Sequence, residues 1–258
     1  MKTLLKAILV LAALGAVAAL VLRLLGRPQQ YAESGEARES MPDLEEVIGD
    51  TRLRTAASYL DEGNVYFNVG QYALAVERYT RALAETPALP AALYNRATAH
   101  TRLGAFDEAL ADYDAAIDLT PADGDALNNR GMLRLYRHEP AEALADFEQA
   151  LALNPDDPTL MVNCGMAQLE TAAHEDALKS FEEAAKVAPG DPAAHYGAAQ
   201  AAAVLGKRTV ALDHLQEAFE IQPAYAAEAA GDARLALLDG DEEFMKLLRR
   251  TAEEAPEE

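Results

Sequence analysis

Small and large apolar residues recur along this chain at the spacing of one helical face. In the stretch LGAFDEALADYDAAIDLTP, residues 103–121, the apolar positions are Phe106, Ala109, Leu110, Tyr113, Ala116 and Ile117. Recurrence at i, i+3, i+4 and i+7 is typical of an amphipathic α-helix. Gly104 before the apolar run and Pro121 after it mark where such a helix begins and ends.

The same pattern returns every 34 residues. Prolines stand at Pro87, Pro121, Pro155, Pro189 and Pro223, and large apolar residues at Tyr79, Tyr113, Phe147, Phe181 and Leu215. Alanines recur in the same register, at 75, 109, 143, 177 and 211 and again at 82, 116, 150, 184 and 218. The sequence therefore predicts five repeats without insertions, over residues 56–89, 90–123, 124–157, 158–191 and 192–225.

Each repeat is expected to form two antiparallel helices. In the second repeat the first helix is predicted from about Pro90 to Leu103 and the second from about Asp107 to Leu119. A proline ends the second helix because the residue before it avoids the α conformation. One helical hairpin cannot bury its own apolar face, so the repeats have to stack on one another.

Two further segments flank the predicted array. Residues 226–258 indicate a pair of capping helices with a turn at Asp239–Gly240, followed by an acidic tail. Residues 28–55 have the composition of a polar linker and include a short predicted helix near 43–54. An atypical end segment is what a stacked array needs to cover its last apolar face.

Residues 1–27 are predicted to be a signal anchor. The chain is uncharged from Ala7 to Leu22. With Leu24 and Leu25 included, the apolar helix would be about 28 Å long, close to the roughly 30 Å core of a bilayer. We expect a single membrane helix over residues 4–25, and hence a single-pass membrane protein.

A cleaved signal peptide is the alternative, because Ala16 and Ala18 form an acceptable cleavage site. Cleavage would yield a secreted, periplasmic repeat protein. Positive charge flanks both ends of the apolar stretch and gives little bias in orientation. We expect the repeats to be extracytoplasmic, and a cytoplasmic orientation stays open.

Composition restricts the chemistry. The formal net charge of -21 argues against nucleic acid as a partner, since phosphate binding needs clustered Lys and Arg. Cys164 is the only cysteine, which excludes an intrachain disulfide, and the five histidines occupy five different positions of the repeat. The sequence lacks a phosphate-binding glycine loop, a nucleophile elbow and a zinc-hydrolase motif. We predict no catalytic residues, no metal site and no cofactor, and therefore not an enzyme.

This order of small, aromatic, alanine and proline positions resembles the tetratricopeptide repeat (TPR) family over residues 56–225. The resemblance implies an all-α, right-handed α-solenoid of five TPR repeats that binds a protein or peptide partner. The third repeat departs from the family pattern, with His138 at the usual turn glycine and Pro140 at a usual aromatic position. Proline is acceptable there as the first residue of a helix.

In this family, ligands touch the first helix of each repeat on the concave side of the array. The matching candidates here are Asn64, Phe67, Tyr94, Asn95, Arg102, Asn129, Met132, Tyr136, Asn163, Met166 and Tyr196. Asn95, Asn129 and Asn163 form an evenly spaced ladder whose amides could bond a peptide backbone, or could satisfy neighbouring groups of the protein itself. The apolar members suit a hydrophobic peptide or an amphipathic helix, and Arg102 is the evident cation among them.

Arg96 and Arg130 are expected to form ion pairs within their repeats, with Asp112 and Asp146. Without chemistry of its own, the array is predicted to be a membrane-tethered interaction scaffold in a cell-envelope assembly. The alternative is a homo-oligomeric structural protein, in which the helix near 43–54 fills the groove of the same or a neighbouring chain. A third reading is an accessory subunit of an enzyme complex.

Overall fold

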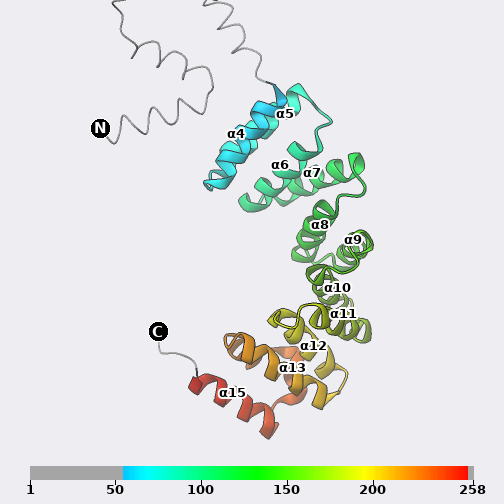
Figure 1. Ribbon diagram of the computed structural model, residues 1–258, viewed down its shortest axis with the longest axis vertical. Coiled ribbons are helices and arrows are strands. Elements are labelled where there is room, and N and C mark those ends of the chain that lie inside the picture. The colour runs from blue at the N-terminus through cyan, green and yellow to red at the C-terminus, as the bar shows by residue number, and fades with distance from the viewer. Residues whose placement is uncertain (1–54, 255–258) are drawn as a thin grey trace, which may run out of the picture. The chain divides into compact units, whose positions relative to one another are not determined.

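The computed structural model describes residues 55–254, and these residues form helices and turns without a strand (Figure 1). Chain contacts separate two units, Met1–Arg54 and Thr55–Glu258, and the account below concerns the second unit. The predicted membrane helix at 4–25, most of the linker and the predicted helix near 43–54 lie outside the described residues.

Five helix pairs follow one another with the predicted period. The first helices of the pairs are α4 (Ala56–Asn68), α6 (Pro90–Leu103), α8 (Gly124–Tyr136), α10 (Pro158–Glu170) and α12 (Pro192–Val204). The second helices are α5 (Tyr72–Glu85), α7 (Phe106–Leu119), α9 (Pro140–Leu153), α11 (His174–Val187) and α13 (Arg208–Ile221). The prediction of an all-helical array of helix pairs is thus confirmed.

The ends of these helices follow from local sequence. The first helices of repeats 3 to 5 begin after Asp123, Asp157 and Asp191, whose carboxylates accept hydrogen bonds from backbone N–H groups of the first turn. Between the two helices of a pair, the chain passes through the left-handed region, at φ +75° for Gly104. His138 takes up this conformation at φ 60°, so the non-glycine residue of repeat 3 keeps the same turn.

The helices form two layers. Each first helix contacts the first helix of the next repeat, and the second helices α5, α7, α9 and α11 each pack between two first helices. The first helices therefore line one side of the array, in line with the TPR resemblance. Below, the inner face denotes the side of α4, α6, α8, α10 and α12 that carries the predicted binding positions.

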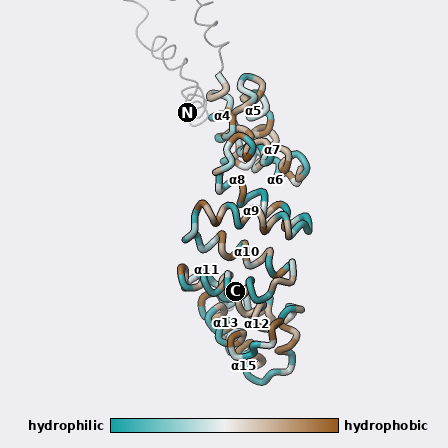
Figure 2. Tube along the Cα trace, turned by 90° about the vertical axis from the view of Figure 1, so that its right-hand side faces the viewer, coloured by the Kyte–Doolittle hydropathy of each residue, from teal (hydrophilic) through white to brown (hydrophobic). Residues whose placement is uncertain are grey.

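Large side chains fill the space between neighbouring repeats. Tyr79, Tyr113, Phe147, Phe181 and Leu215 recur at one position of the second helix and are all buried. They pack against alanines and glycines of the first helices, which lets helices approach closely. Hydrophobic and hydrophilic residues alternate along the helices as the amphipathic pattern requires (Figure 2).

The C-terminal end differs from the expected helix pair. It consists of the short helix α14 (Tyr225–Ala229), the 3₁₀ helix η2 (Ala233–Leu238) and the amphipathic helix α15 (Glu242–Glu254). The chain leaves α14 at Gly231, and the Asp232 carboxylate then accepts the N–H of Arg234 at 2.9 Å, which begins η2. Leu235, Leu238 and Phe244 are buried against α12 and α13, so the segment does cover the last repeat.

The predicted localisation has to be corrected. The helices of residues 55–254 have at most 14 residues, or about 21 Å at 1.5 Å per residue, against roughly 30 Å for a bilayer core. No helix in this part of the chain is long and apolar enough to cross a membrane. A single-pass membrane protein is therefore not supported.

Candidate functional site on the inner face

The asparagine ladder links neighbouring repeats. Asn95 Nδ2 donates to Asn64 Oδ1 at 2.8 Å, and Asn163 Nδ2 donates to Asn128 Oδ1 at 2.7 Å. Asn129 Nδ2 donates to the hydroxyl of Tyr94 at 2.9 Å. Each ladder amide thus uses one N–H to reach a side chain of the preceding repeat. The ladder amides therefore satisfy neighbouring groups of the protein itself, which is one of the two roles that the sequence left open. Their contact with a ligand stays a prediction.

Repeat 2 holds a cluster of hydroxyl groups. The rings of Tyr94 and Tyr113 meet edge to face with centroids 6.0 Å apart, and the Tyr113 hydroxyl lies 3.1 Å from Thr98 Oγ1. Burial raises the pKa of Tyr113, while hydrogen bonds from Thr98 and Asn129 and the positive charge of Arg102 oppose that rise. Tyr94 remains partly exposed.

The end of α8 presents an apolar surface. Tyr136 is 68% exposed and Met132 is 41% exposed, although both are large hydrophobic side chains. The Tyr136 ring packs on Phe106 of α7 with centroids 4.8 Å apart, so it is held in place while one face stays open. A fixed, exposed aromatic side chain is suited to the binding of a hydrophobic residue.

Arg102 stands at the same position of α6 as Tyr136 does on α8. It is exposed in the last turn of α6 and has no ion-pair or hydrogen-bond partner among residues 55–254. Most arginines of this part of the chain are paired, as Arg137 is with Asp107 and Glu139. An unpaired guanidinium on the inner face is therefore available to an anionic group of a ligand.

The predicted residues of repeat 1 contact other side chains of the protein. Asn64 Oδ1 accepts from the hydroxyl of Tyr79 at 2.9 Å in addition to Asn95, so its carbonyl is engaged within the protein. Phe67 is half-buried and meets Tyr72 edge to face, with centroids 5.2 Å apart. These two residues shape the inner face and stay predictions as ligand contacts.

The inner face of repeat 5 is already covered by the C-terminal segment. Tyr196 is only 7% exposed, and its hydroxyl donates to Asp232 Oδ2 at 2.8 Å. Gln200 donates to the same oxygen, and Arg234 forms an ion pair with Glu170 of α10. Sequence reasoning missed Asp232 as an inner-face residue. The Gly231–Asp232 pair, which interrupts the helical pattern, could have indicated a turn and a helix cap at this place.

The remaining candidates, Asn163 and Met166 of repeat 4, are buried or partly buried. Asn163 is only 5% exposed, and Met166 is half-buried against the core of the last two repeats. The structure therefore brings together Tyr94, Asn95, Arg102, Asn129, Met132 and Tyr136 as an accessible set on α6 and α8. It separates this set from the candidates of repeats 4 and 5.

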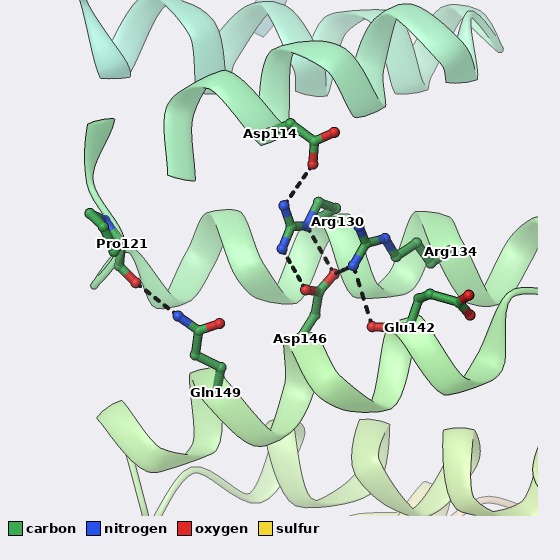
Figure 3. Close-up of polar contacts among 7 residues, drawn as sticks. All are labelled: Asp114, Pro121, Arg130, Arg134, Glu142, Asp146 and Gln149. Carbon is green, nitrogen blue, oxygen red and sulfur yellow. Dashed lines mark hydrogen bonds and ion pairs between the residues drawn. The ribbon is translucent and has the colours of Figure 1, made fainter. Parts of the chain in front are cut away.

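The predicted ion pairs are present and are more extensive than expected (Figure 3). Arg130 donates to both oxygens of Asp146, at 3.0 and 2.6 Å, and also to Asp114 of the preceding repeat at 2.6 Å. Arg134 donates to Asp146 as well, at 2.8 Å. Asp146 is buried, so this network holds α8 against α9 within repeat 3 and is structural, while the Arg130–Asp114 pair also reaches repeat 2.

Two titratable groups replace the ion pair in later repeats. Cys164 takes the position of Arg130, and burial raises the pKa of its thiol to about 12, so it is not a reactive thiolate at neutral pH. His214 takes the position of Asp146, and its Nδ1 lies 3.1 Å from Nδ1 of His195. These two histidines occupy different positions of the repeat, so the sequence did not predict a contact between them. The packing of α12 and α13 brings them together. Within residues 55–254, no three His, Cys, Asp or Glu side chains form a group that could hold a metal ion.

Comparison with known structures agrees with this architecture. YrrB, described as a TPR protein with an unusual peptide-binding site, is 24% identical over 77% of this chain and 97% of its own, with a TM-score of 0.62. MamA is 20% identical over 67% of this chain and 94% of its own, with a TM-score of 0.61. MamA from Desulfovibrio magneticus RS-1 is 19% identical over 66% and 96%, with a TM-score of 0.62. At these identities the likeness shows the fold.

The comparison with curated proteins gives no match. The sequence model of the tetratricopeptide repeat family matches residues 60–124, 128–192 and 165–226. These segments span more than half of the chain and agree with the observed helix pairs. The chain therefore belongs to the tetratricopeptide repeat family.

Proposed function

We propose that this protein is an interaction scaffold that binds a peptide or helical segment of a partner protein on the inner face of repeats 2 and 3. One observation carries the proposal: Met132 and Tyr136 expose 41% and 68% of large apolar side chains, and the unpaired Arg102 stands at the same position of α6 as Tyr136 does on α8. An apolar surface with a polar edge is typical of a binding site for a peptide or helix.

The arrangement of the array supports this location. In repeat 5 the chain's own C-terminal segment contacts Tyr196 and Gln200. The accessible candidates are on α6 and α8, where the fixed Tyr136 ring could receive an apolar side chain. YrrB, the TPR protein whose peptide-binding site is described, has the same fold.

Selection of peptides from a random display library tests the proposal. The full-length chain is immobilised, and bound peptides are compared with those kept by Tyr136→Ser and by Met132→Ser. We expect the wild-type chain to enrich peptides with hydrophobic residues and either substitution to weaken their binding. Failure of the wild-type chain to enrich any peptide would contradict the proposal.

Leu153→Ser is the matched control for these variants. Leu153 is 41% exposed, like Met132, but it lies at the end of the second helix α9. Its replacement removes the same amount of exposed apolar surface from the other layer. Equal loss of peptide binding in Leu153→Ser and Met132→Ser would show that the inner face is not the site.

Self-assembly is a second candidate, favoured by the first helix of the array. Val65 of α4 is 63% exposed, whereas Ala99, Leu133, Ala167 and Ala201 at the same position of later repeats are buried. There the residue packs against the preceding repeat. A second chain stacked on α4 would cover Val65 in the same way. Light scattering of the wild-type chain and of Val65→Asp tests this, because loss of an oligomer is expected only if this face forms the contact.

A further inference from the structure

The first helices of repeats 2 and 3 run in the same direction. Near their N-terminal ends, Asn129 Nδ2 of α8 donates to the Tyr94 hydroxyl of α6 at 2.9 Å. At their C-terminal ends, the Tyr136 ring of α8 packs on Phe106, which follows the turn after α6. Contacts at both ends thus place the start of α8 next to the start of α6. The inner face of these two repeats therefore has two distinct ends.

Asp125 lies at the N-terminal end of this surface. It is exposed in the first turn of α8 and has no ion-pair or hydrogen-bond partner among residues 55–254. Residues four apart share one face of a helix, so Asp125 lies one turn before Asn129, the residue that bonds Tyr94. An unpaired carboxylate therefore faces the same side of the array as the amide that contacts Tyr94.

The electrostatics of Tyr94 agree with this placement. Burial is the largest cause that raises the pKa of Tyr94, and Tyr113, Asp125 and Asp123 add to the rise, while the hydrogen bond from Asn129 opposes it. Asp123 caps α8 by accepting a backbone N–H of its first turn at 3.0 Å, and it brings a second carboxylate to this end. These carboxylates favour a cation here and repel an anion.

The same face of α8 becomes apolar towards its C-terminus. Met132 follows Asp125 by seven residues and Tyr136 follows Met132 by four, which are the spacings of one helical face. Both apolar side chains are exposed. At 1.5 Å per residue, Asp125 and Met132 are about 10 Å apart along the helix axis. One face of α8 thus offers a carboxylate at one end and an apolar surface at the other.

Arg102 makes the two ends electrically different. It is the thirteenth residue of α6, as Tyr136 is of α8, so it belongs to the C-terminal end of the surface. On α6 it follows Tyr94 by eight residues, about 12 Å along the helix axis. Its positive charge disfavours a basic ligand residue at the C-terminal end. A basic residue is therefore directed to the end where Asp125 lies.

The two repeats also carry a surplus of negative charge. Residues 90–157 contain thirteen acidic and five basic residues. Four of the five arginines already form ion pairs with acidic side chains, and Arg102 is the fifth. The surplus is thus not neutralised within these repeats. Charge complementarity selects partners and speeds their association, so this surface favours a basic partner over an acidic one.

We propose that the inner face of repeats 2 and 3 binds a basic amphipathic segment of a partner protein. A lysine or arginine of the segment pairs with Asp125, and apolar residues of the segment pack on Met132 and Tyr136. The span of about 10 Å places the basic residue about seven positions from an apolar residue in a helix, or about three positions in an extended peptide. This inference rests on the proposed function and adds the chemical class of the partner.

The test is a selection from a library of random twelve-residue peptides, carried out with the full-length wild-type chain, with Asp125→Asn and with Asp118→Asn. Asp118 is the matched control, because it is an exposed aspartate of the second helix α7 that has no partner among the described residues. Both substitutions change the net charge equally. We expect the wild type and Asp118→Asn to enrich peptides with Lys or Arg at this distance from apolar residues. Asp125→Asn should keep the apolar preference and show a weaker basic one.

The outcomes separate the two proposals. Enrichment of apolar peptides without a basic preference would overturn the basic ligand and leave the scaffold function intact. Enrichment of acidic peptides would overturn it as well. An equal basic preference in all three chains would show that the overall negative charge attracts the peptides and that Asp125 does not bind them. No enrichment by any chain would overturn the scaffold function.

Affinity measurements on one selected peptide give a second readout. Replacing its basic residue by glutamine should weaken binding to the wild-type chain about threefold, as the loss of one exposed ion pair does. The same replacement should weaken binding to Asp118→Asn equally and have little effect on Asp125→Asn, because the pair is already broken there. An equal loss in Asp125→Asn and in the wild type would show that the basic residue does not pair with Asp125.

Discussion

The hydroxyl of Tyr196 donates a hydrogen bond to the carboxylate of Asp232, 2.8 Å away, and this contact covers the inner face of the last repeat. Asp232 is the residue at which the C-terminal segment turns from α14 into η2. The ion pair of Arg234 with Glu170 also ties η2 to α10, but the two side chains are 36% and 51% exposed, so it adds little stability. Asp232 is therefore the main polar attachment of the C-terminal segment.

Asp232→Ala is expected to loosen the C-terminal segment. The substitution removes the cap of η2 and leaves Tyr196 and Gln200 without their acceptor, at a cost of about 1–3 kcal/mol. Hydrogen exchange should become faster in residues 225–251 and stay unchanged in repeats 1 to 3, since repeats interact mainly with their neighbours. Asp239→Ala, a change of an exposed aspartate in the same segment, is the control. Equal exchange in both variants would show that Asp232 does not hold the segment.

Asp146→Asn is expected to destabilise the middle of the array. The carboxylate is buried and accepts hydrogen bonds from both Arg130 and Arg134. Neutralising it leaves Arg134 without its counter-charge and Arg130 with only the exposed Asp114, which costs about 3 kcal/mol for a buried ion pair. The urea midpoint of unfolding should fall clearly. In Asp114→Asn, where an exposed carboxylate meets Arg130 alone, the loss should stay below about 1 kcal/mol. Similar losses would show that burial does not decide the strength of this network.

The repeat architecture could be predicted from sequence because each position recurs five times. Prolines, glycines and alanines that recur at the same positions of the repeat mark where helices end and where they touch. Their period of 34 residues sets the register. The ion pairs of Arg96 and Arg130 followed from the same register. Residues outside the repeated positions could not be placed in this way. Asp232 belongs to no repeat, so only the three-dimensional structure shows that it reaches Tyr196.

The candidate site was predicted in outline only. Family positions indicated which helices face inward, and this identified Tyr94, Arg102 and Tyr136. They did not indicate which inner positions remain accessible, because accessibility depends on where the C-terminal segment lies. The histidine contact was missed for a related reason: His195 and His214 occupy different positions of the repeat but meet between α12 and α13.

Gly197→Ala is expected to strain the contact between repeats 4 and 5. A Cβ atom at Gly197 would lie 2.3 Å from the nearest ring atom of Phe181, and one at Gly165 would lie 2.7 Å from the other side of that ring. The ring is held between two helices and has little room to retreat, so we expect a loss of about 1–3 kcal/mol from overpacking. Gly190→Ala is the control, because no atom lies within 4 Å of its added Cβ. The prediction fails if both variants unfold at the same urea concentration as the wild type.

Acidification is expected to weaken the packing of α12 and α13. Burial, and then the neighbouring His195, lower the pKa of His214, while Glu182, Asp213 and Glu217 oppose the shift. Nε2 of His195 lies 3.1 Å from the carbonyl oxygen of Pro189 and donates to it, so Nδ1 of His195 accepts the hydrogen bond from Nδ1 of His214, 3.1 Å away. Because the folded pKa lies below the unfolded value, the unfolded chain binds the proton first as the pH falls. Stability is therefore full above the ordinary pKa of histidine and declines as the pH drops towards the folded pKa.

Urea unfolding at about pH 7.5 and pH 5.5, on either side of the ordinary histidine pKa, measures this effect. The wild-type midpoint should fall at the lower pH, and the fall should be smaller in His214→Gln, which cannot be protonated. Part of the fall should remain, because burial also lowers the pKa of His100. His100→Gln serves as the second variant, and the double variant should show the smallest dependence on pH. If His214→Gln loses as much stability on acidification as the wild type, the histidine contact does not couple proton binding to the folding of the last repeat.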